Sequence, residues 1–437
     1  MSRTGSQVAP LYRRLPHGPS GMDRDEVARN QRARLYGAMI ESIAQRGYQA
    51  TTVAHVIGLA GVSRRAFYEL FTNKEACFLA TYDIIVARAR KRVIDAWVGE
   101  RGWANRLHAA CKALFDEVAE SPRGPHLVLV DALGVGPKAR ERMQLASFTF
   151  ERLVASAFQA APDGVGFSRL TSRGVVGGVR HVVFLRMLEH RERELYTLTD
   201  EVLDWIESYR TPAAARLGLL GLAPTTRVPP TPAAFLARDD KRARVLGSVV
   251  HLTLDEGYSR LTDPQIAQFA GMSTEAFHKQ FPNKEECFLA VLDEFVAEGL
   301  DAVRPSFEEA ASWPEGVYRA MAAFIDYLVA HQALLRIAFI DVFEVGPGMI
   351  GRLTKSIECF TALLTEHGPE PRRGPEVAQE AITGAIWSII SSYVANDRLA
   401  RLPCLVDHLA FIVLSPYIGS KAAVEEIQGA RRPLRAV

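Results

Sequence analysis

One stretch of this chain occurs twice, 210 residues apart. The segment GVSRRAFYELFTNKEACFLA begins at Gly61, and GMSTEAFHKQFPNKEECFLA begins at Gly271. The alignment continues without a gap from Arg34 to Arg142 of the first copy. A match of this length predicts a duplicated domain rather than a short repeat. Two domains also suit 437 residues, which are too many for one ordinary core.

Apolar residues recur at helical spacing in both copies, and the alternation typical of half-buried strands is absent. The sequence therefore predicts an all-α chain of two tandem units, punctuated by proline and glycine. The predicted parts are a disordered arm (1–22), a first helix-turn-helix domain (23–72), a first helical body (73–210), a Pro-rich linker (211–240), a second, divergent helix-turn-helix domain (241–282), a second helical body (283–420) and a tail (421–437).

The composition and the absence of catalytic motifs narrow the function classes. A formal net charge of +2 means that any affinity for nucleic acid must come from local basic patches. No cofactor, metal site or enzymatic activity is expected, because no P-loop, dinucleotide fingerprint, zinc spacing or nucleophile–base arrangement occurs. Cys77 and Cys287 occupy equivalent apolar positions and are predicted to be buried, reduced thiols. We found no signal peptide or membrane-length apolar run, which predicts a cytoplasmic protein.

The repeated stretch has the pattern of a helix-turn-helix. Thr51 or Thr52 can cap a first short helix, Gly61 allows a turn, and Ser63 can cap the second helix. Phe67, Leu70 and Phe71 fall on one face of that helix, so Arg64, Arg65 and Tyr68 must lie on the other. The first residues of the second helix in such a unit are those that meet DNA.

In the order and spacing of these residues, followed by NKE at Asn73, the chain resembles the TetR/AcrR family of transcriptional regulators, duplicated in tandem. The resemblance implies a three-helix DNA-binding head on a helical body that binds a small effector and dimerises through its last two helices. It implies contacts with operator DNA from Thr51, Thr52, Ser63, Arg64, Arg65, Tyr68 and Lys74. The arm with Arg3, Arg13 and Arg14 either adds minor-groove contacts or is a solvated tail.

The second copy keeps the apolar skeleton and changes the outward residues. Its candidate DNA contacts are Thr262, Ser273, Thr274, His278 and Lys284, and Glu275 replaces Arg65. A carboxylate directed at the DNA backbone is unfavourable unless it accepts a hydrogen bond from a cytosine amino group. The second head has therefore either lost DNA affinity or reads a different half-site.

The remaining expectations concern the bodies. The resemblance implies an apolar effector pocket, expected between Trp97 and Leu188 of the first copy. The candidate lining residues are Phe115, Asp131, Phe148, Phe184, Phe324 and Asp341, with a structural role for the two aspartates as the alternative. Because one chain carries two bodies, the helices around 174–189 and 200–209 are predicted to pack on those around 380–394 and 406–414 as an intramolecular pseudo-dimer, with a homodimer of chains as the alternative. Two functions remain open. The first is a transcriptional repressor that an apolar or amphipathic effector releases from DNA. The alternative is a helical ligand-binding or protein-interaction module whose DNA-binding heads are vestigial.

Overall fold

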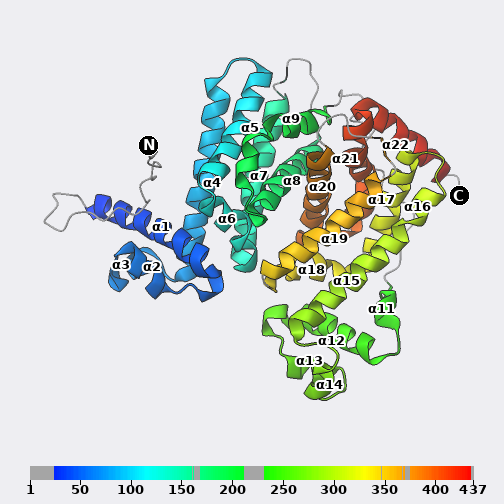
Figure 1. Cartoon of the computed structure of the whole chain (residues 1–437), viewed down its shortest axis with the longest axis horizontal. Helices are drawn as coiled ribbons and strands as arrows, with labels where there is room; N and C mark the ends of the chain where they lie inside the picture. The colour runs from blue at the N-terminus through cyan, green and yellow to red at the C-terminus, as the bar shows by residue number, and fades with distance from the viewer. Residues whose placement is uncertain are drawn as a thin grey trace, which may run out of the picture.

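A computed structural model of the chain describes residues 24–159, 161, 168–210, 231–345, 347–366, 368–369 and 375–434. Every secondary-structure element within these ranges is a helix, as the sequence predicts. Two small heads project from a central mass of longer helices (Figure 1). The predicted arm (1–22) and most of the predicted linker lie outside the described residues.

The first copy consists of a three-helix head and a helical body. The elements of the head are α1 (Arg24–Ala50), α2 (Val53–Ala60) and α3 (Arg64–Leu70). The body contains α4 (Lys74–Gly99), α5 (Trp103–Glu120), α6 (Arg123–Leu129), η1 (Asp131–Gly134), α7 (Pro137–Gln159), α8 (Arg169–Leu188), η2 (Glu192–Tyr196) and α9 (Thr199–Glu207). The head has its own apolar core, which α6 and η1 extend by contributing Leu127, Val128 and Ala132.

The second copy repeats this order, and its described residues include four additional elements, α11, η3, α16 and α22. Its elements are α11 (Ala234–Ala237), α12 (Lys241–Glu256), η3 (Tyr258–Arg260), α13 (Asp263–Phe269), α14 (Thr274–His278), α15 (Lys284–Val303), α16 (Pro305–Glu308), α17 (Trp313–Ala330), α18 (Gln332–Phe339), η4 (Asp341–Glu344), α19 (Pro347–Thr365), α20 (Pro375–Ala395), η5 (Leu399–Leu405), α21 (Val406–Ile418) and α22 (Ser420–Leu434). Two segments differ from the expected linker and tail. Phe235 of α11 is buried, with its backbone N–H bonded to Glu298, and Ile427 of α22 is buried against the second body.

The duplication extends to individual hydrogen bonds. The indole nitrogen of Trp103 donates to the carbonyl of Ala157 at 2.7 Å, and that of Trp313 donates to the carbonyl of Leu364 at 2.9 Å. The two tryptophans are 210 residues apart, but their acceptors are 207 apart. The offset between the copies therefore falls from 210 to 207 within α7 and α19, after Arg142 of the first copy and before Ala157.

Helices α8 and α20 cross at a point where neither helix has a side chain. A Cβ placed on Gly177 would lie 2.8 Å from the carbonyl oxygen of Gly384, and one on Gly384 would lie 2.7 Å from the carbonyl oxygen of Gly177. The same built atoms would lie 2.2 Å from Cβ of Ser388 and of His181 respectively. Each glycine thus faces the other and the residue four positions further along the partner helix. This reciprocity is the mark of a two-fold relationship between the copies, with Gly177 equivalent to Gly384.

The second helices of the expected interface also contribute. The hydroxyl of Tyr209, just beyond α9, is buried and donates to the carbonyl of Ile412 in α21 at 2.9 Å. Ile412 also lies against Gly174 of α8. The helix packing predicted for the two bodies is therefore present within one chain.

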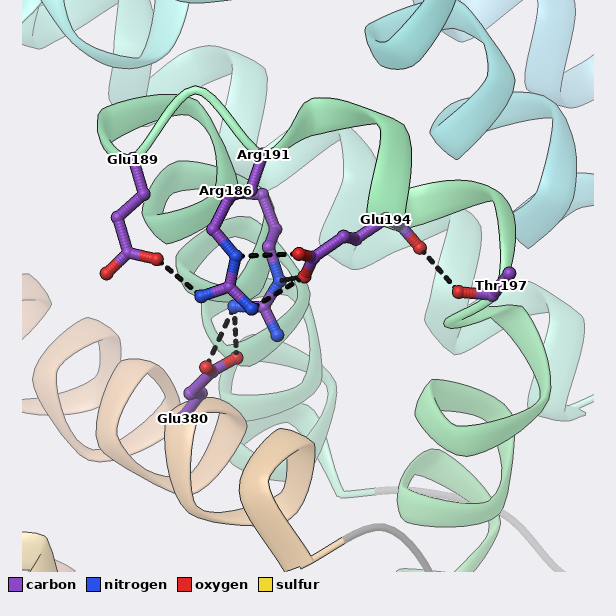
Figure 2. A network of polar contacts seen from close by, with 6 residues as sticks. All are labelled: Arg186, Glu189, Arg191, Glu194, Thr197 and Glu380. Atoms are coloured by element: carbon purple, nitrogen blue, oxygen red, sulfur yellow. Dashed lines mark hydrogen bonds and ion pairs between the residues drawn. The ribbon is translucent and has the colours of Figure 1, made fainter.

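A polar network crosses the same interface (Figure 2). Arg186 of α8, with a side chain 3% exposed, donates to both carboxylate oxygens of Glu380 in α20 at 2.8 and 3.0 Å, and its Nε lies 3.2 Å from Glu194. With equivalent residues of α8 and α20 differing by 207, Arg173 is the counterpart of Glu380. Two first bodies pairing with each other would therefore place Arg173 opposite Arg186. The charges thus favour pairing of unlike copies.

One stretch is apolar and long enough to resemble a membrane span. Among the described helices, the run Leu399–Ile418 reaches a mean hydropathy of 1.4, and 67% of its most apolar window is buried inside the protein. It contains Asp407, which bonds to Tyr318 and Arg431. The run therefore forms part of the core of the second body, and its composition follows from that burial.

We predict that Gly384→Ala destabilises the protein, because the added methyl group would overlap His181 and the backbone of α8. Overpacking of this kind costs about 1–3 kcal/mol. Gly247→Ala in α12 is the matched control, since its Cβ would meet nothing within 4 Å and alanine favours a helix. Thermal unfolding followed by circular dichroism should show a lower midpoint for Gly384→Ala only. Equal midpoints for the two variants would contradict the close approach of α8 and α20.

Candidate nucleic-acid interface and ligand cavity

Helix α3 presents its basic residues to solvent because its apolar side is fixed. Ser63 caps the helix by accepting a hydrogen bond from the backbone N–H of Ala66 at 3.1 Å. Phe67 is fully buried in the core of the head, so Arg64, Arg65 and Tyr68 point outward, with Tyr68 46% exposed. These three residues form the surface that the sequence assigned to DNA.

The contacts of the two arginines leave them able to rearrange. Arg65 forms an ion pair with Glu69 at 2.9 Å, with side chains 90% and 60% exposed. The guanidinium of Arg64 lies 5.8 Å from the centre of the Tyr68 ring. Exposed ion pairs of this kind contribute about 0–1 kcal/mol, so a phosphate or a guanine edge can replace these partners.

The two threonines before α2 have different positions. Thr52 is exposed and is the N-cap of α2. Its hydroxyl accepts a hydrogen bond from the backbone N–H of His55 at 3.3 Å, and the ring nitrogen Nδ1 of His55 accepts one from the backbone N–H of Thr52. Thr51 is 1% exposed, and its hydroxyl donates within the head to the carbonyls of Ser42 and Gly47. The expectation that Thr51 contacts DNA is therefore wrong, because its side chain faces the core.

Lys74 and Lys284 also face inward. The ammonium of Lys74 donates to the carbonyls of Tyr48 and Thr51, both at 2.9 Å, and lies 4.1 Å from the centre of the Tyr48 ring. Lys284 makes the same contacts with Tyr258 and Leu261. Burial lowers the pKa of both lysines. These contacts bind the start of the long fourth helix to the turn before the second, a structural role in place of the phosphate contact expected from the sequence.

The second head repeats the scaffold with different outward chemistry. Thr262 and Ser273 are N-caps, and Phe277 is buried like Phe67. Glu275 forms an ion pair with Lys279 at 3.0 Å, at the positions that Arg65 and Glu69 occupy in the first head. The pair is thus reversed, and the carboxylate now lies at the end of the helix expected to meet DNA.

The other candidate contacts of the second head give it no compensating charge. Thr274 replaces Arg64 and is half-buried. His278 replaces Tyr68, and its ring lies 3.1 Å from the carbonyl of Pro282. Helix α14 therefore presents much less positive charge than α3.

The first body encloses an apolar cavity of about 450 Å³, bounded mainly by α4, α5, α6, α7 and α8. Its wall is largely valine, leucine and alanine, with Trp97 and Phe150 among its aromatic members. Arg180 is the only charged residue among the described residues that line it. The cavity lies in the region where the sequence predicts one, and its volume is in the range that drug-sized ligands occupy.

The residues that line the cavity are not those expected from the sequence. Phe115 is packed in the core, Phe148 is 41% exposed on α7, and Phe184 stacks on His181 beside the interface. Asp131 accepts from the ring of His126 at 2.9 Å, which raises the pKa of that histidine. Phe115, Phe148 and Phe184 are therefore corrections, because the prediction selected large aromatic side chains whereas the wall is built mainly from small aliphatic ones. The contact of Asp131 with His126 agrees with the structural alternative for that aspartate.

The equivalent cavity of the second body is about 80 Å³ because aromatic rings occupy it. The rings of Phe324 and Phe360 lie 4.2 Å apart between centres and are tilted by 34°, and Phe339 stacks on Trp387 at 4.3 Å. Phe324 lines this small space, and its role at an effector site stays a prediction. Asp341 does not; it is buried 3.4 Å from Arg336, and burial raises its pKa to about 6. This agrees with the structural alternative for Asp341.

Other chemistry is not apparent in the described part of the chain. Cys77 and Cys287 are buried, and burial raises the pKa of each thiol to about 12. We found no group of three or more histidine, cysteine or carboxylate side chains placed to hold a metal ion within the described residues. The features with functional geometry are thus the α3 surface and the cavity of the first body.

Two helix-turn-helix heads on helical bodies define a DNA-binding regulator. The family model for bacterial regulatory proteins of the tetR family matches the chain at residues 37–81 and again at 250–291. The chain therefore carries the DNA-binding domain of the tetR family twice.

Comparisons with individual proteins match about one copy of the duplication. The HTH-type transcriptional activator FasR of Mycolicibacterium smegmatis is 25% identical over 168 residues, which are 37% of this chain and 76% of that protein. Among solved structures, the fatty acid degradation regulator FadR of Bacillus halodurans has a TM-score of 0.38 at 16% identity and covers 40% of this chain and 94% of its own. FadR of Bacillus subtilis, solved in complex with stearoyl-CoA, has a TM-score of 0.37 at 16% identity and covers 40% of this chain and 96% of its own.

We predict that Lys74→Met lowers the stability of the first head by about 1–3 kcal/mol, because two partly buried carbonyls lose their donor. Lys91→Met is the control, since Lys91 is exposed and forms only a surface pair with Asp95. Thermal melting separates the two roles of Lys74. If Lys74→Met left the melting curve unchanged but reduced the salt dependence of DNA binding, the phosphate role would be restored.

Proposed function

We propose that this protein regulates transcription by binding an operator mainly through its first head, and that a ligand in the first body alters that binding. The observation that carries the proposal is the surface of α3, where Arg64, Arg65 and Tyr68 are held outward by a buried Phe67. Guanidinium groups in this position suit both phosphates and guanine edges. Thr52 and Ser63, exposed at the starts of α2 and α3, are the proposed additional phosphate contacts.

The position of the cavity supports control by a ligand. Tyr82 of α4 and Val128 of α6 line the cavity and also belong to the apolar core of the first head. A ligand that moves either residue therefore acts on the packing beneath α2 and α3. The effector is an apolar or amphipathic small molecule, because the cavity wall is almost entirely apolar.

The proposed direction of control is repression in the cytoplasm, released by the effector. Activation is the second candidate, because the matched FasR of Mycolicibacterium smegmatis is an activator by name. A third candidate is a ligand-binding or protein-interaction module without DNA binding. The reversed ion pair on α14 favours loss of DNA binding for the second head, but not for the first.

The proposed arrangement on DNA is a single chain acting as its own dimer. The reciprocal packing of α8 and α20 supports it, as does the Arg186–Glu380 pair between unlike copies. The domain boundaries proposed from the sequence place one head and one body on each side of this interface. Such a chain would prefer an asymmetric operator, with the stronger half-site under α3.

We predict that Arg64→Ala with Arg65→Ala weakens operator binding and reduces its salt dependence. The logarithm of the binding constant falls with the logarithm of the salt concentration, and each lost phosphate contact makes this slope less steep by about 0.9. The matched control is Thr274→Ala with Glu275→Ala at the equivalent positions of the second head. Gel-shift titrations with DNA from upstream of the protein's own gene, over a salt series, measure both. The first pair should lose affinity while the second keeps it.

The contrary outcomes of this experiment are distinct. Unchanged binding by Arg64→Ala with Arg65→Ala would remove α3 as the interface. Equal losses from the two double variants would show that both heads contribute equally and would remove the dominance of the first.

We further predict a mass near 48.2 kDa in light scattering at low micromolar concentration, because the interface is satisfied within one chain. A mass near twice that value would favour a homodimer of chains. Footprinting adds an independent check, since equal protection of two inverted half-sites would contradict an asymmetric operator.

A further inference from the structure

Arg180 of α8 is a cation on the wall of the first-body cavity. None of the described residues forms a hydrogen bond or an ion pair with it. Burial lowers its pKa, yet a guanidinium remains charged at neutral pH. An unpaired charge in apolar surroundings is unfavourable, so this position favours an anionic ligand.

The neighbouring carboxylates are already engaged. Glu151 accepts two hydrogen bonds from Arg173, at 3.0 and 3.1 Å. Asp83 pairs with Arg142 at 2.9 Å. Glu151 is close enough to stabilise the charge of Arg180, but its hydrogen bonds go to Arg173, and the described residues give Arg180 no hydrogen bond or ion pair of its own.

Tyr82 of α4 provides a second polar group on the same wall. Its side chain is 2% exposed and lines the cavity, and its hydroxyl has no hydrogen-bond partner among the described residues. Burial raises its pKa, and the charge of Arg180, on the same cavity wall, opposes that rise. A guanidinium and a neutral phenol are both donors. Together they suit a carboxylate, which only accepts.

The second body is an internal comparison. Leu292 stands at the position of Tyr82, and Trp387 at the position of Arg180, with the offsets of 210 and 207 that α15 and α20 follow. Both residues line the space of about 80 Å³ that remains there. The two donors and the large cavity are thus present together in one copy and absent together from the other.

We propose that the first body binds an amphipathic carboxylic acid, one molecule per chain, with its carboxylate on Arg180 and Tyr82 and its apolar portion filling the cavity. This inference rests on the proposed function in one respect, which is that the cavity is the effector site. Binding of the acid to the cavity requires no DNA and can be measured separately. The second body binds no such acid.

The test is isothermal titration of the full-length protein with dodecanoate, below its micellar concentration, and in parallel with its methyl ester and with dodecyl phosphate. We expect one dodecanoate per chain and about 10- to 100-fold weaker binding of the ester, as for loss of a charge-assisted hydrogen bond. Equal binding of acid and ester, two acids per chain, or binding of the phosphate alone would each overturn the proposal.

Variants locate the headgroup. Arg180→Met should weaken binding of the acid about 10- to 100-fold and leave binding of the ester unchanged, and Tyr82→Phe should have a smaller effect in the same direction. Arg180→Lys keeps the charge and should retain part of the affinity. Arg152→Met, an exposed arginine on α7, is the control and should bind the acid normally. Melting curves establish that each variant is folded, and an unchanged affinity in Arg180→Met would exclude this residue as the anion site.

Operator binding distinguishes this inference from the function on which it rests. Dodecanoate that binds as expected but leaves the gel shift unchanged would support the ligand assignment and contradict effector control. A gel shift that responds equally to the acid and to its ester would contradict the ligand assignment and support effector control.

Discussion

The close approach of α8 and α20 is the contact on which the rest of the architecture depends. Gly177 and Gly384 bring two backbones together, and any side chain at either position would separate them. In the Arg186–Glu380 pair at the same interface Arg186 is buried and Glu380 is half-buried, and the pair aligns unlike copies rather than like ones. Removing either partner would leave the other charge largely desolvated and unpaired, so the charges favour this pairing. The crossing thus sets the distance between the two bodies, and the ion pair favours contact between a first body and a second body.

Around this shared interface the copies have kept their internal supports and changed their exposed and cavity-lining residues. The lysine that joins the fourth helix to the head occurs in both, and so does the tryptophan that anchors the fifth helix. The surface of the recognition helix has reversed its ion pair, and the cavity has exchanged Arg180 and Tyr82 for Trp387 and Leu292. Both changes alter the chemistry that the second copy presents, while its body still packs against the first.

Much of this was accessible from the sequence, because it depends on local rules. Helical periodicity, the N-caps at Thr52 and Ser63, and the repeat itself all follow from short-range patterns. Thr51 and Lys74 were placed wrongly, because a polar residue near a surface can turn inward when unbonded carbonyls lie within its reach. The cavity residues were also missed. Valines that line a cavity have the same helical spacing in the sequence as valines that pack in a core. The sequence therefore does not show where side chains leave a space unfilled.

The α8–α20 interface joins two halves of one polypeptide, which changes how its formation depends on abundance. An interface between separate chains dissociates on dilution by mass action, so a scarce regulator loses its paired state. An intrachain interface follows first-order kinetics, and its occupancy is set by the length of the connection rather than by the number of molecules in the cell. A regulator built in this way keeps both heads together even when only a few copies are made.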